Sequence, residues 1–362
     1  SYAVAVGIST IGCLLKRDIY IDQHGEEGWG WNVYPNQSVM LVGPSGIGKD
    51  TAIDYATRTI EDLDIVPVFG GRTIENIFHR LISLSKPACC YIPAGELTAF
   101  FGNRDYQSGM VQDITDLLST KEKKDVSTKS DLVIKGPQII HQPTLTMHCG
   151  TTEEWLHKAM PEGTMEGGFL GRFLIIVEQF GRKQVPLVKH AITSNKERTQ
   201  LKQSSERWKD GLKLIIESCT QVGEVILYTE AQDVYTNWYW NRFNLFSKAV
   251  LPYANRSRDT VLRLAMLMAV SRMHFGWVED VDIQFGIDVL AFVSKRIDEA
   301  LQPPTIEAQI GKEILRMCPT TDKEMLKALG RKYKPRDIVN GQHLLMQQGF
   351  AKIEGDKIVK TN

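Results

Sequence analysis

The sequence predicts an α/β protein: a three-layer sandwich of a parallel sheet between helices, followed by a smaller C-terminal domain. An apolar run at 39–42 leads through a glycine-rich loop into a helical pattern at 52–56, which indicates a strand, a loop and a helix in succession. Further strand patterns alternate with helical patterns, as in a parallel sheet; they lie at 88–92, 144–149 and 174–177. The pair Pro303-Pro304 marks the boundary of the second domain.

The glycine-rich loop carries the most specific motif of the chain. Its sequence is Gly43-Pro44-Ser45-Gly46-Ile47-Gly48-Lys49-Asp50-Thr51. Glycines 43, 46 and 48 are expected to adopt positive φ and to turn N–H groups toward a phosphate, while Lys49 reaches the β and γ oxygens. All nine residues are therefore candidate ligands of a nucleoside triphosphate, ATP. The alternative is a glycine-rich turn with a chance lysine.

Two departures from the usual phosphate-loop pattern concern the metal ion. Asp50 stands where G-x-x-x-x-G-K-[ST] has the hydroxyl that binds Mg²⁺, and Thr51 follows it. The strand at 88–92 leads into Gly95-Glu96, which gives Glu96 the place of a catalytic carboxylate and Gly95 that of a magnesium-directing aspartate. We expect Asp50, Thr51 and Glu96 to hold Mg²⁺, with Asp50 compensating for Gly95. Alternatively, Glu96 is a solvated residue at a helix start.

Polar residues beside the later strands complete the candidate catalytic set. The run at 144–149 ends in Gly150-Thr151-Thr152, whose hydroxyls are placed to sense a γ-phosphate or to orient water. Arg172 follows a glycine-rich loop and opens the next strand, from which a guanidinium fork can reach the nucleotide of a neighbouring subunit. His148 and Cys149 are expected to pack in the core.

A lysine-rich segment precedes the strand at 144–149. Its composition favours a protruding β-hairpin, and its basic residues are Lys121, Lys123, Lys124, Lys129 and Lys135. We expect the first four lysines to bind single-stranded DNA through its phosphates. The alternative is a solvated surface without a ligand.

Helices dominate the rest of the chain. Residues 231–248 predict one aromatic helix, which packs in the core or stacks on bases, and Arg263 lies near the start of the next helix. Beyond residue 303, three helical patterns and a two-strand hairpin around Glu354-Gly355-Asp356 predict a winged helix that binds DNA or packs against proteins. Its third helix and hairpin carry Arg331, Lys332, Lys334, Arg336, Lys352, Lys357 and Lys360.

This order of motifs resembles the ATPase domain of phage and prophage replicative helicases and primase-helicases, a P-loop domain long catalogued without a function. The resemblance covers about residues 1–300 and includes the phosphate loop, the strand ending in Glu96, the Gly-Thr-Thr strand end, the Gly-Phe-Leu-Gly-Arg-Phe block and the Val-Leu-Arg-Leu-Ala helix. The Arg-Phe and Arg-Leu-Ala blocks are also similar to the minichromosome-maintenance branch of AAA+ ATPases.

The resemblance implies a role for each matching residue. Arg172 matches an arginine finger, Thr151 or Thr152 a first sensor, and Arg263 a second sensor that binds nucleotide. The segment from Lys121 to Lys135 matches a hairpin that enters the pore. The implied assembly is a homo-oligomeric ring, a hexamer, that hydrolyses ATP with Mg²⁺ at its interfaces and moves along single-stranded or forked DNA, with a primase or other replication proteins as further partners.

These matches divide the chain into three expected domains. The P-loop ATPase core, AAA+-like, occupies 1–190, a helical lid with the second sensor occupies 191–302, and the winged helix occupies 303–362. The chain has 43 basic and 43 acidic residues, so any nucleic-acid contact must come from a local patch. Six cysteines without paired spacing indicate a reducing compartment, and no apolar run is long enough for a membrane span. We therefore expect a cytoplasmic protein, in a bacterial host if it is phage-encoded.

Two other functions remain open from the sequence. A loader or regulatory AAA+ ATPase would use the same motifs to remodel a protein or bind an origin without unwinding DNA. A nucleotide kinase is suggested because Gly-Lys-Asp-Thr also occurs in small phosphate-loop kinases. A monomeric kinase, however, has no need for Arg172 or for a trailing winged helix.

Overall fold

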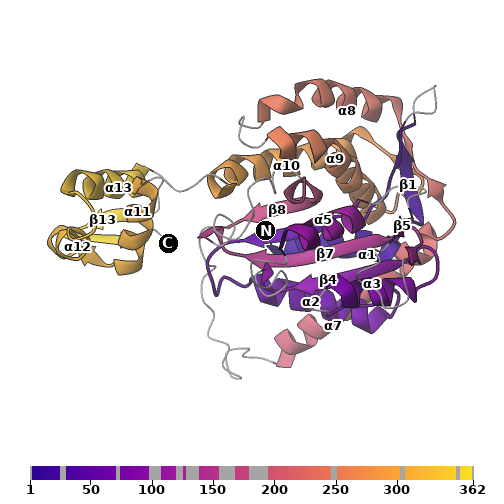
Figure 1. The fold of residues 1–362 in the computed structure, drawn as a ribbon, viewed down its shortest axis with the longest axis horizontal. Helices are drawn as coiled ribbons and strands as arrows, with labels where there is room; N and C mark the ends of the chain where they lie inside the picture. Colours follow the sequence, from indigo (N-terminus) through magenta and orange to yellow (C-terminus); the bar gives the residue numbers. More distant parts are fainter. Residues whose placement is uncertain are drawn as a thin grey trace. The chain divides into compact units, whose positions relative to one another are not determined.

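The computed structural model divides the chain into two compact units, Ser1–Leu301 and Gln302–Asn362, each described here by itself (Figure 1). The structure describes residues 2–24, 30–70, 74–97, 107–119, 125–127, 138–154, 168–178, 195–245, 251–301, 306–347 and 351–360. The sequence places a boundary at 303, beside the division between the units. The two domains expected over 1–190 and 191–302 fall, up to residue 301, within the same compact unit.

The first unit is built on a four-stranded parallel sheet with the order β4-β7-β3-β8. Its strands are β3 (Ser38–Val42), β4 (Cys89–Ala94), β7 (Thr144–Thr151) and β8 (Phe173–Val177). Every residue of β3, β7 and β8 is buried, which explains the apolar character of β3 and β8, while β7 buries threonines and His148 between its apolar residues. A parallel bridge from Val68 to Tyr91 adds one more segment beyond β4. The predicted mixed α/β fold with a parallel sheet is therefore confirmed.

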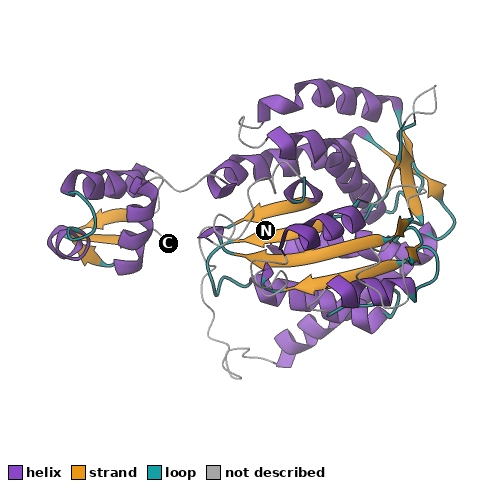
Figure 2. Ribbon diagram, in the orientation of Figure 1, coloured by secondary structure: helices purple, strands orange, loops and turns teal. Residues whose placement is uncertain are grey.

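Helices cover the sheet on both faces (Figure 2). The first half of the unit contains α1 (Tyr2–Leu15), α2 (Lys49–Leu63), α3 (Ile74–Ile82) and α5 (Gln107–Leu118). The second half contains α7 (Asn195–Cys219), α8 (Thr229–Asn241), α9 (Leu251–Ser271) and α10 (Asp280–Leu301). Helix α1 packs on β3 and against α2, α5 contacts β7, and α10 lies along β8. Within the described residues, no helix combines the length and the apolar character that a membrane crossing requires.

Short strands join the two halves of this unit. Strand β1 (Ile19–Asp22) pairs with β2 (Asn32–Val33) on one side and, in parallel, with β9 (Gly223–Glu224) on the other. Strands β10 (Ile226–Leu227) and β11 (Trp277–Val278) form a second small sheet. Strand β9 from the expected lid thus pairs with β1 from the expected core, and α7, α8, α9 and α10 share one hydrophobic core with the parallel sheet.

The aromatic helix predicted over 231–248 is shorter than expected. Helix α8 ends at Asn241, and the 3-10 helix η4 (Arg242–Leu245) follows. Trp238 is 8% exposed whereas Trp240 is 74% exposed, because residues i and i+2 of a helix point in directions about 200° apart. The Arg242 guanidinium lies over the rings of Tyr239 and Phe243, at 3.9 and 4.2 Å from their centroids. The aromatic residues are therefore divided between the core and the surface.

The second unit has its own core beneath three helices and a small antiparallel sheet. The helices are α11 (Ile306–Met317), α12 (Asp322–Leu329) and α13 (Pro335–Gln347), and the strands are β12 (Thr320–Thr321), β13 (Ala351–Glu354) and β14 (Lys357–Lys360). Gly355 adopts φ +67° in the turn between β13 and β14. The Thr321 hydroxyl and the Glu324 carboxylate form a capping box at the start of α12. Strand β12, which pairs with β14, was not predicted.

A buried histidine ties three elements of the first unit together. His148 on β7 is fully buried, with Nε2 2.7 Å from Ser9 Oγ and Nδ1 3.0 Å from the Tyr91 hydroxyl. Ser9 donates its only hydroxyl proton to Gln37 O, so Nε2–H must donate to Ser9 and Nδ1 must accept from Tyr91. Burial lowers the pKa of His148 to about 3. The expected core role of His148 is confirmed by this burial.

Acidification should destabilise this unit through His148. Between pH 7 and pH 5 the unfolded chain binds a proton at His148 that the native state excludes, which lowers the free energy of unfolding by about 2 kcal/mol. All seven tryptophans lie in residues 1–301, so urea unfolding followed by tryptophan fluorescence reports on this unit. A His148→Gln variant should lose about 2 kcal/mol less than the native sequence over this pH interval. Equal losses in the two proteins would contradict the assignment.

Candidate nucleotide site and arginine cluster

The glycine-rich loop connects β3 to α2, as the sequence predicts. Gly46 and Gly48 adopt φ of +82° and +92°, a region that residues with a side chain rarely occupy, and Gly48 directly precedes α2. Pro44, Ser45, Gly46 and Gly48 are exposed, so the loop backbone is open to a ligand.

The expectation of positive φ at Gly43 was wrong, because this glycine is required for close packing instead. A Cβ at Gly43 would lie 2.4 Å from the Glu178 carbonyl oxygen and 2.6 Å from the Tyr2 hydroxyl. The Tyr2 hydroxyl donates a hydrogen bond of 2.6 Å to Val42 O, beneath the start of the loop. Helix α1 thus supports the loop from below.

Lys49 begins α2 and is held under the loop. Its side chain is only 8% exposed, and Nζ donates to the carbonyl oxygens of Gly43 and Pro44 at 2.7 and 2.8 Å. Burial lowers the pKa of Lys49, and the neighbouring carboxylates of Asp50 and Glu96 raise it part of the way back. The ammonium group is therefore positioned to exchange loop carbonyls for phosphate oxygens.

The ends of β4 and β7 meet beside the loop. A Cβ at Gly150 would lie 2.3 Å from Gly95 O and 3.7 Å from Lys49 Cβ, so only glycine permits this approach. Thr151 is 5% exposed and accepts the Gly43 N–H through its carbonyl oxygen at 3.1 Å. The next residue, Thr152, is only partly buried and is the better placed of the two predicted sensor hydroxyls for a ligand. Cys149 is fully buried, as expected for a core residue.

Asp50 lies beside Gly95, although the two residues are on different elements. A Cβ at Gly95 would be 3.2 Å from Asp50 Oδ1 and 3.9 Å from its Cγ. The Asp50 carboxylate therefore occupies space next to the position where the sequence lacks an aspartate. Asp50, Thr51 and Glu96 are all exposed at this edge of the sheet, where carboxylate oxygens suit Mg²⁺. The donor set fits a hard divalent cation.

Arg172 lies at the opposite edge of the sheet from its own phosphate loop. It is the last residue of the 3-10 helix η3 (Leu170–Arg172) and directly precedes β8. The first residue of β8, Phe173, pairs with Ser38 at the beginning of β3. The phosphate loop follows the other end of these strands, where Val42 pairs with Val177. The five residues of β8 separate the two edges by roughly 16 Å. The structure thus brings Lys49, Asp50 and Glu96 together at the loop edge of the sheet and places Arg172 at the opposite edge.

The Arg172 guanidinium is bound by groups of its own chain. Nε donates to Ser119 Oγ at 2.9 Å, just beyond the carboxyl end of α5, and Nη1 donates to Gly168 O at 2.6 Å. Burial and the nearby charges of Arg256 and Arg263 lower the pKa of Arg172 to about 10. Arg263, the expected second sensor, therefore lies near Arg172. Sequence reasoning did not identify Arg256 as a site residue, because its proximity to Arg172 depends on the packing of α9 against η3.

The lysine-rich segment is only partly described. Strand β5 (Val126–Ser127) pairs antiparallel with β6 (Ile139–Ile140), which is the pairing that a hairpin over the intervening residues requires. The candidate DNA ligands Lys121, Lys123, Lys124 and Lys129 lie outside the described residues.

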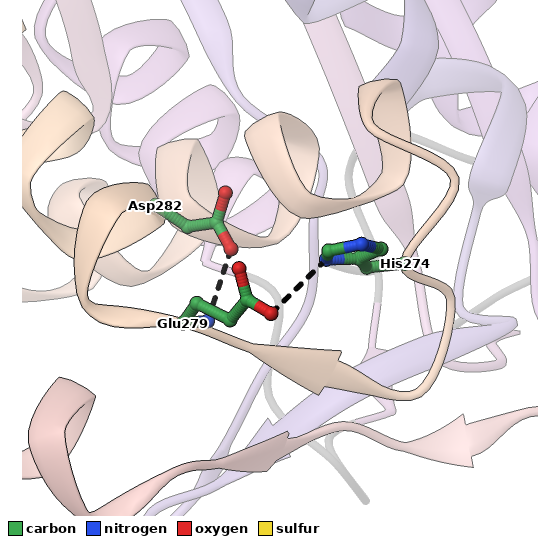
Figure 3. Close-up of side chains that lie close together, drawn as sticks. All are labelled: His274, Glu279 and Asp282. Atoms are coloured by element: carbon green, nitrogen blue, oxygen red, sulfur yellow. Dashed lines mark hydrogen bonds and ion pairs between the residues drawn. The ribbon is translucent and has the colours of Figure 1, made fainter.

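A second polar cluster lies at the start of α10 (Figure 3). His274, Glu279 and Asp282 offer ligand atoms within 4.8 Å of one another. The Arg272 guanidinium already binds both carboxylates, at 2.6 Å to Glu279 and 2.8 Å to Asp282. Asp282 Oδ2 also accepts the Glu279 N–H at 3.0 Å, so the cluster caps the helix. A metal ion would have to displace Arg272, and we interpret the cluster as structural.

Neither protein-family models nor curated proteins match this chain. Two groups of charged residues stand out in the described part of the first unit. One is the loop edge of the sheet, with Lys49, Asp50 and Glu96. The other is the arginine cluster, defined as Arg172, Arg256 and Arg263.

Replacing Asp282 tests the structural interpretation of the second polar cluster. Asp282→Ala should lower the free energy of unfolding by about 1–3 kcal/mol, because the Glu279 N–H loses its acceptor. Addition of Zn²⁺ or Ni²⁺ should leave the melting temperature of the native sequence unchanged. A melting temperature that rises with either metal, and no longer rises in Asp282→Ala, would show that the cluster holds an ion.

Proposed function

We propose that this protein is an ATP-driven ring helicase or translocase of viral or mobile-element DNA replication, with a P-loop ATPase unit of AAA+ type that hydrolyses ATP between subunits. The observation that carries the proposal is the separation of the two groups of charged residues. The loop edge carries Lys49, Asp50 and Glu96, whereas the arginine cluster lies at the other edge of the same sheet.

The loop edge supplies what nucleotide binding requires. Gly46 and Gly48 open the backbone toward phosphates, and Lys49 provides a cation beneath them. Asp50, Thr51 and Glu96 would hold Mg²⁺, which neutralises phosphate charge when it is bound. In this proposal Glu96 activates the attacking water, and Thr152 orients it.

The arginine cluster supplies what the loop edge lacks. An arginine roughly 16 Å from its own phosphate loop cannot contact the phosphate bound there, but it can contact the phosphate of a second copy. Contact between one edge of a subunit and the opposite edge of the next is a heterologous interface, which closes into a ring when its rotation permits. We therefore propose a homo-oligomeric ring, a hexamer by the resemblance, in which Arg172 acts across the interface.

DNA is the proposed track. The antiparallel pairing of β5 with β6 supports a hairpin over the intervening residues, which include Lys129 and Lys135, whereas Lys121, Lys123 and Lys124 directly precede β5. In the second unit, three helices followed by the β13–β14 hairpin support a winged-helix domain, with exposed Arg336 on α13 and exposed Lys352 and Lys357 on the hairpin. A replication protein of this kind would work in the cytoplasm of a bacterial host, beside a primase or other replication proteins.

Mixed subunits test the function most directly. Arg172→Ala should reduce ATP hydrolysis by about 10³–10⁵-fold while nucleotide affinity changes by less than roughly tenfold, since the arginine acts on the transition state. Lys49→Ala should also abolish hydrolysis. Mixing the two variants should restore part of the activity, because some interfaces then combine an intact loop with an intact Arg172.

The matched control is Arg207→Ala on α7, an exposed arginine far along the chain from either group. It should hydrolyse ATP like the native sequence. Mixed rings that form but stay inactive would contradict action across the interface. Strand displacement on a forked DNA substrate then decides between a helicase and a loader ATPase, which would hydrolyse ATP without unwinding.

An exchange of carboxylates tests the metal assignment. Asp50→Thr should raise the Mg²⁺ concentration needed for half-maximal hydrolysis by about tenfold or more, because a charged ligand is lost. Gly95→Asp alone should also impair hydrolysis, since two carboxylates would then repel each other. The double variant Asp50→Thr/Gly95→Asp should recover toward the native Mg²⁺ dependence. A double variant that is as impaired as the sum of the single variants would show that Asp50 does not replace the missing aspartate.

A further inference from the structure

The loop before β8 is shaped by the side chain of Arg256 on α9. A Cβ at Gly168 would lie 2.6 Å from Arg256 Nη2 and 2.7 Å from its Nε. A Cβ at Gly171 would lie 2.6 Å from Arg256 Cδ. The Arg256 side chain therefore runs along this loop from its stem to its guanidinium, and both glycines leave room for it. Gly168 also accepts the hydrogen bond from Arg172 Nη1 through its carbonyl oxygen, so both guanidinium groups meet at this residue.

The arginine cluster concentrates positive charge. Arg256 lowers the pKa of both Arg172 and Arg263, which places all three guanidinium groups within electrostatic range of one another. The acidic neighbours are Asp116 and Asp259, and Asp259 is also 3.5 Å from Arg258 Nε. The charges of three arginines are therefore only partly compensated, and an anion would relieve their repulsion.

Two features of the cluster suit a ligand. The Arg263 Nε is buried and has no hydrogen-bond partner among the described residues, although buried donors of this kind are normally satisfied. Arg256 as a whole is exposed, so an incoming group can reach its planar fork. Guanidinium groups bind phosphate oxygens through paired, charge-assisted hydrogen bonds.

We propose that Arg256 is a direct phosphate ligand and that, with Arg172 and Arg263, it forms one polyphosphate-binding site. The inference rests on the proposed function for the source of the ligand, which is the terminal phosphate of an ATP held by the phosphate loop of a second copy. Glycine is required at positions 168 and 171 because the Arg256 side chain lies across this loop, from where it reaches the ligand beside Arg172.

Binding of tripolyphosphate tests the site without turnover. The measurement uses the full chain with Lys49→Ala, which weakens the phosphate loop as a competing site. Adding Arg256→Gln should raise the dissociation constant for tripolyphosphate by about ten- to a hundredfold, because charge-assisted hydrogen bonds are lost. The control Arg207→Gln, which removes the same charge from the exposed face of α7, should leave the constant unchanged. Equal affinity in the Arg256→Gln and control proteins would overturn the proposal.

A single-stranded oligonucleotide, titrated in parallel, distinguishes the two sources of phosphate. The nucleotide assignment expects Arg256→Gln to weaken tripolyphosphate more than the oligonucleotide. The reverse order would overturn it in favour of a nucleic-acid backbone.

The glycines provide a second, independent measurement. Gly171→Ala should displace Arg256 and reduce ATP hydrolysis about as much as Arg256→Ala does, whereas Gly211→Ala, with open space around it, should not. In the Arg256→Ala background, Gly171→Ala should cause no further loss, since the obstructing side chain is gone. Additive losses would overturn the positioning role of the glycines.

The two proposals fail on different measurements. A native protein that hydrolyses no ATP, with or without single-stranded DNA, would remove the proposed ATPase function and leave the anion site standing. Tripolyphosphate binding that is independent of Arg256 would remove the anion site and leave the ATPase function standing.

Discussion

The close approach of β4 and β7 is the constraint on which the loop edge depends. Gly150 meets the carbonyl oxygen of Gly95, and a single additional carbon at Gly150 would lie 2.3 Å from that oxygen. The same contact brings β4 close enough for the Asp50 carboxylate to lie against Gly95. A larger residue at Gly150 would push the strand ends apart, whereas a Cβ at Gly95 would meet only the Asp50 carboxylate.

Strand direction imposes a second constraint. In a parallel sheet all carboxyl ends share one edge, so the residues that follow β3, β4 and β7 gather there, while a residue that precedes a strand lies at the other edge. Arg172 precedes β8 and consequently lies apart from its own loop. In the ring that we propose, the carboxylates at one edge would face the arginines at the opposite edge of the next copy, and their opposite charges would favour this contact.

The two groups differ in how their charge is balanced. At the loop edge Lys49 binds two carbonyl oxygens of its own loop and has two carboxylates as neighbours. In the cluster around Arg272, two carboxylates surround one guanidinium, and the charges are satisfied within the fold. The cluster of Arg172, Arg256 and Arg263 instead keeps like charges adjacent, and the Arg263 Nε in it is buried without an acceptor among the described residues. This contrast is the reason why we propose a binding site at the arginine cluster and a structural role for the cluster around Arg272.

The sequence by itself determined the features that depend on local chemistry: the strand, loop and helix around Lys49, the division of the chain near Pro303-Pro304, and the strands of a parallel sheet. It did not determine the reason for Gly43, the length of α8, or the pairing of β9 with β1. Only the tertiary structure decided that Asp50 lies beside Gly95 and that Arg256 lies across Gly168 and Gly171. Local patterns follow from the periodicity of neighbouring residues, whereas these contacts join distant segments through the packing of whole elements.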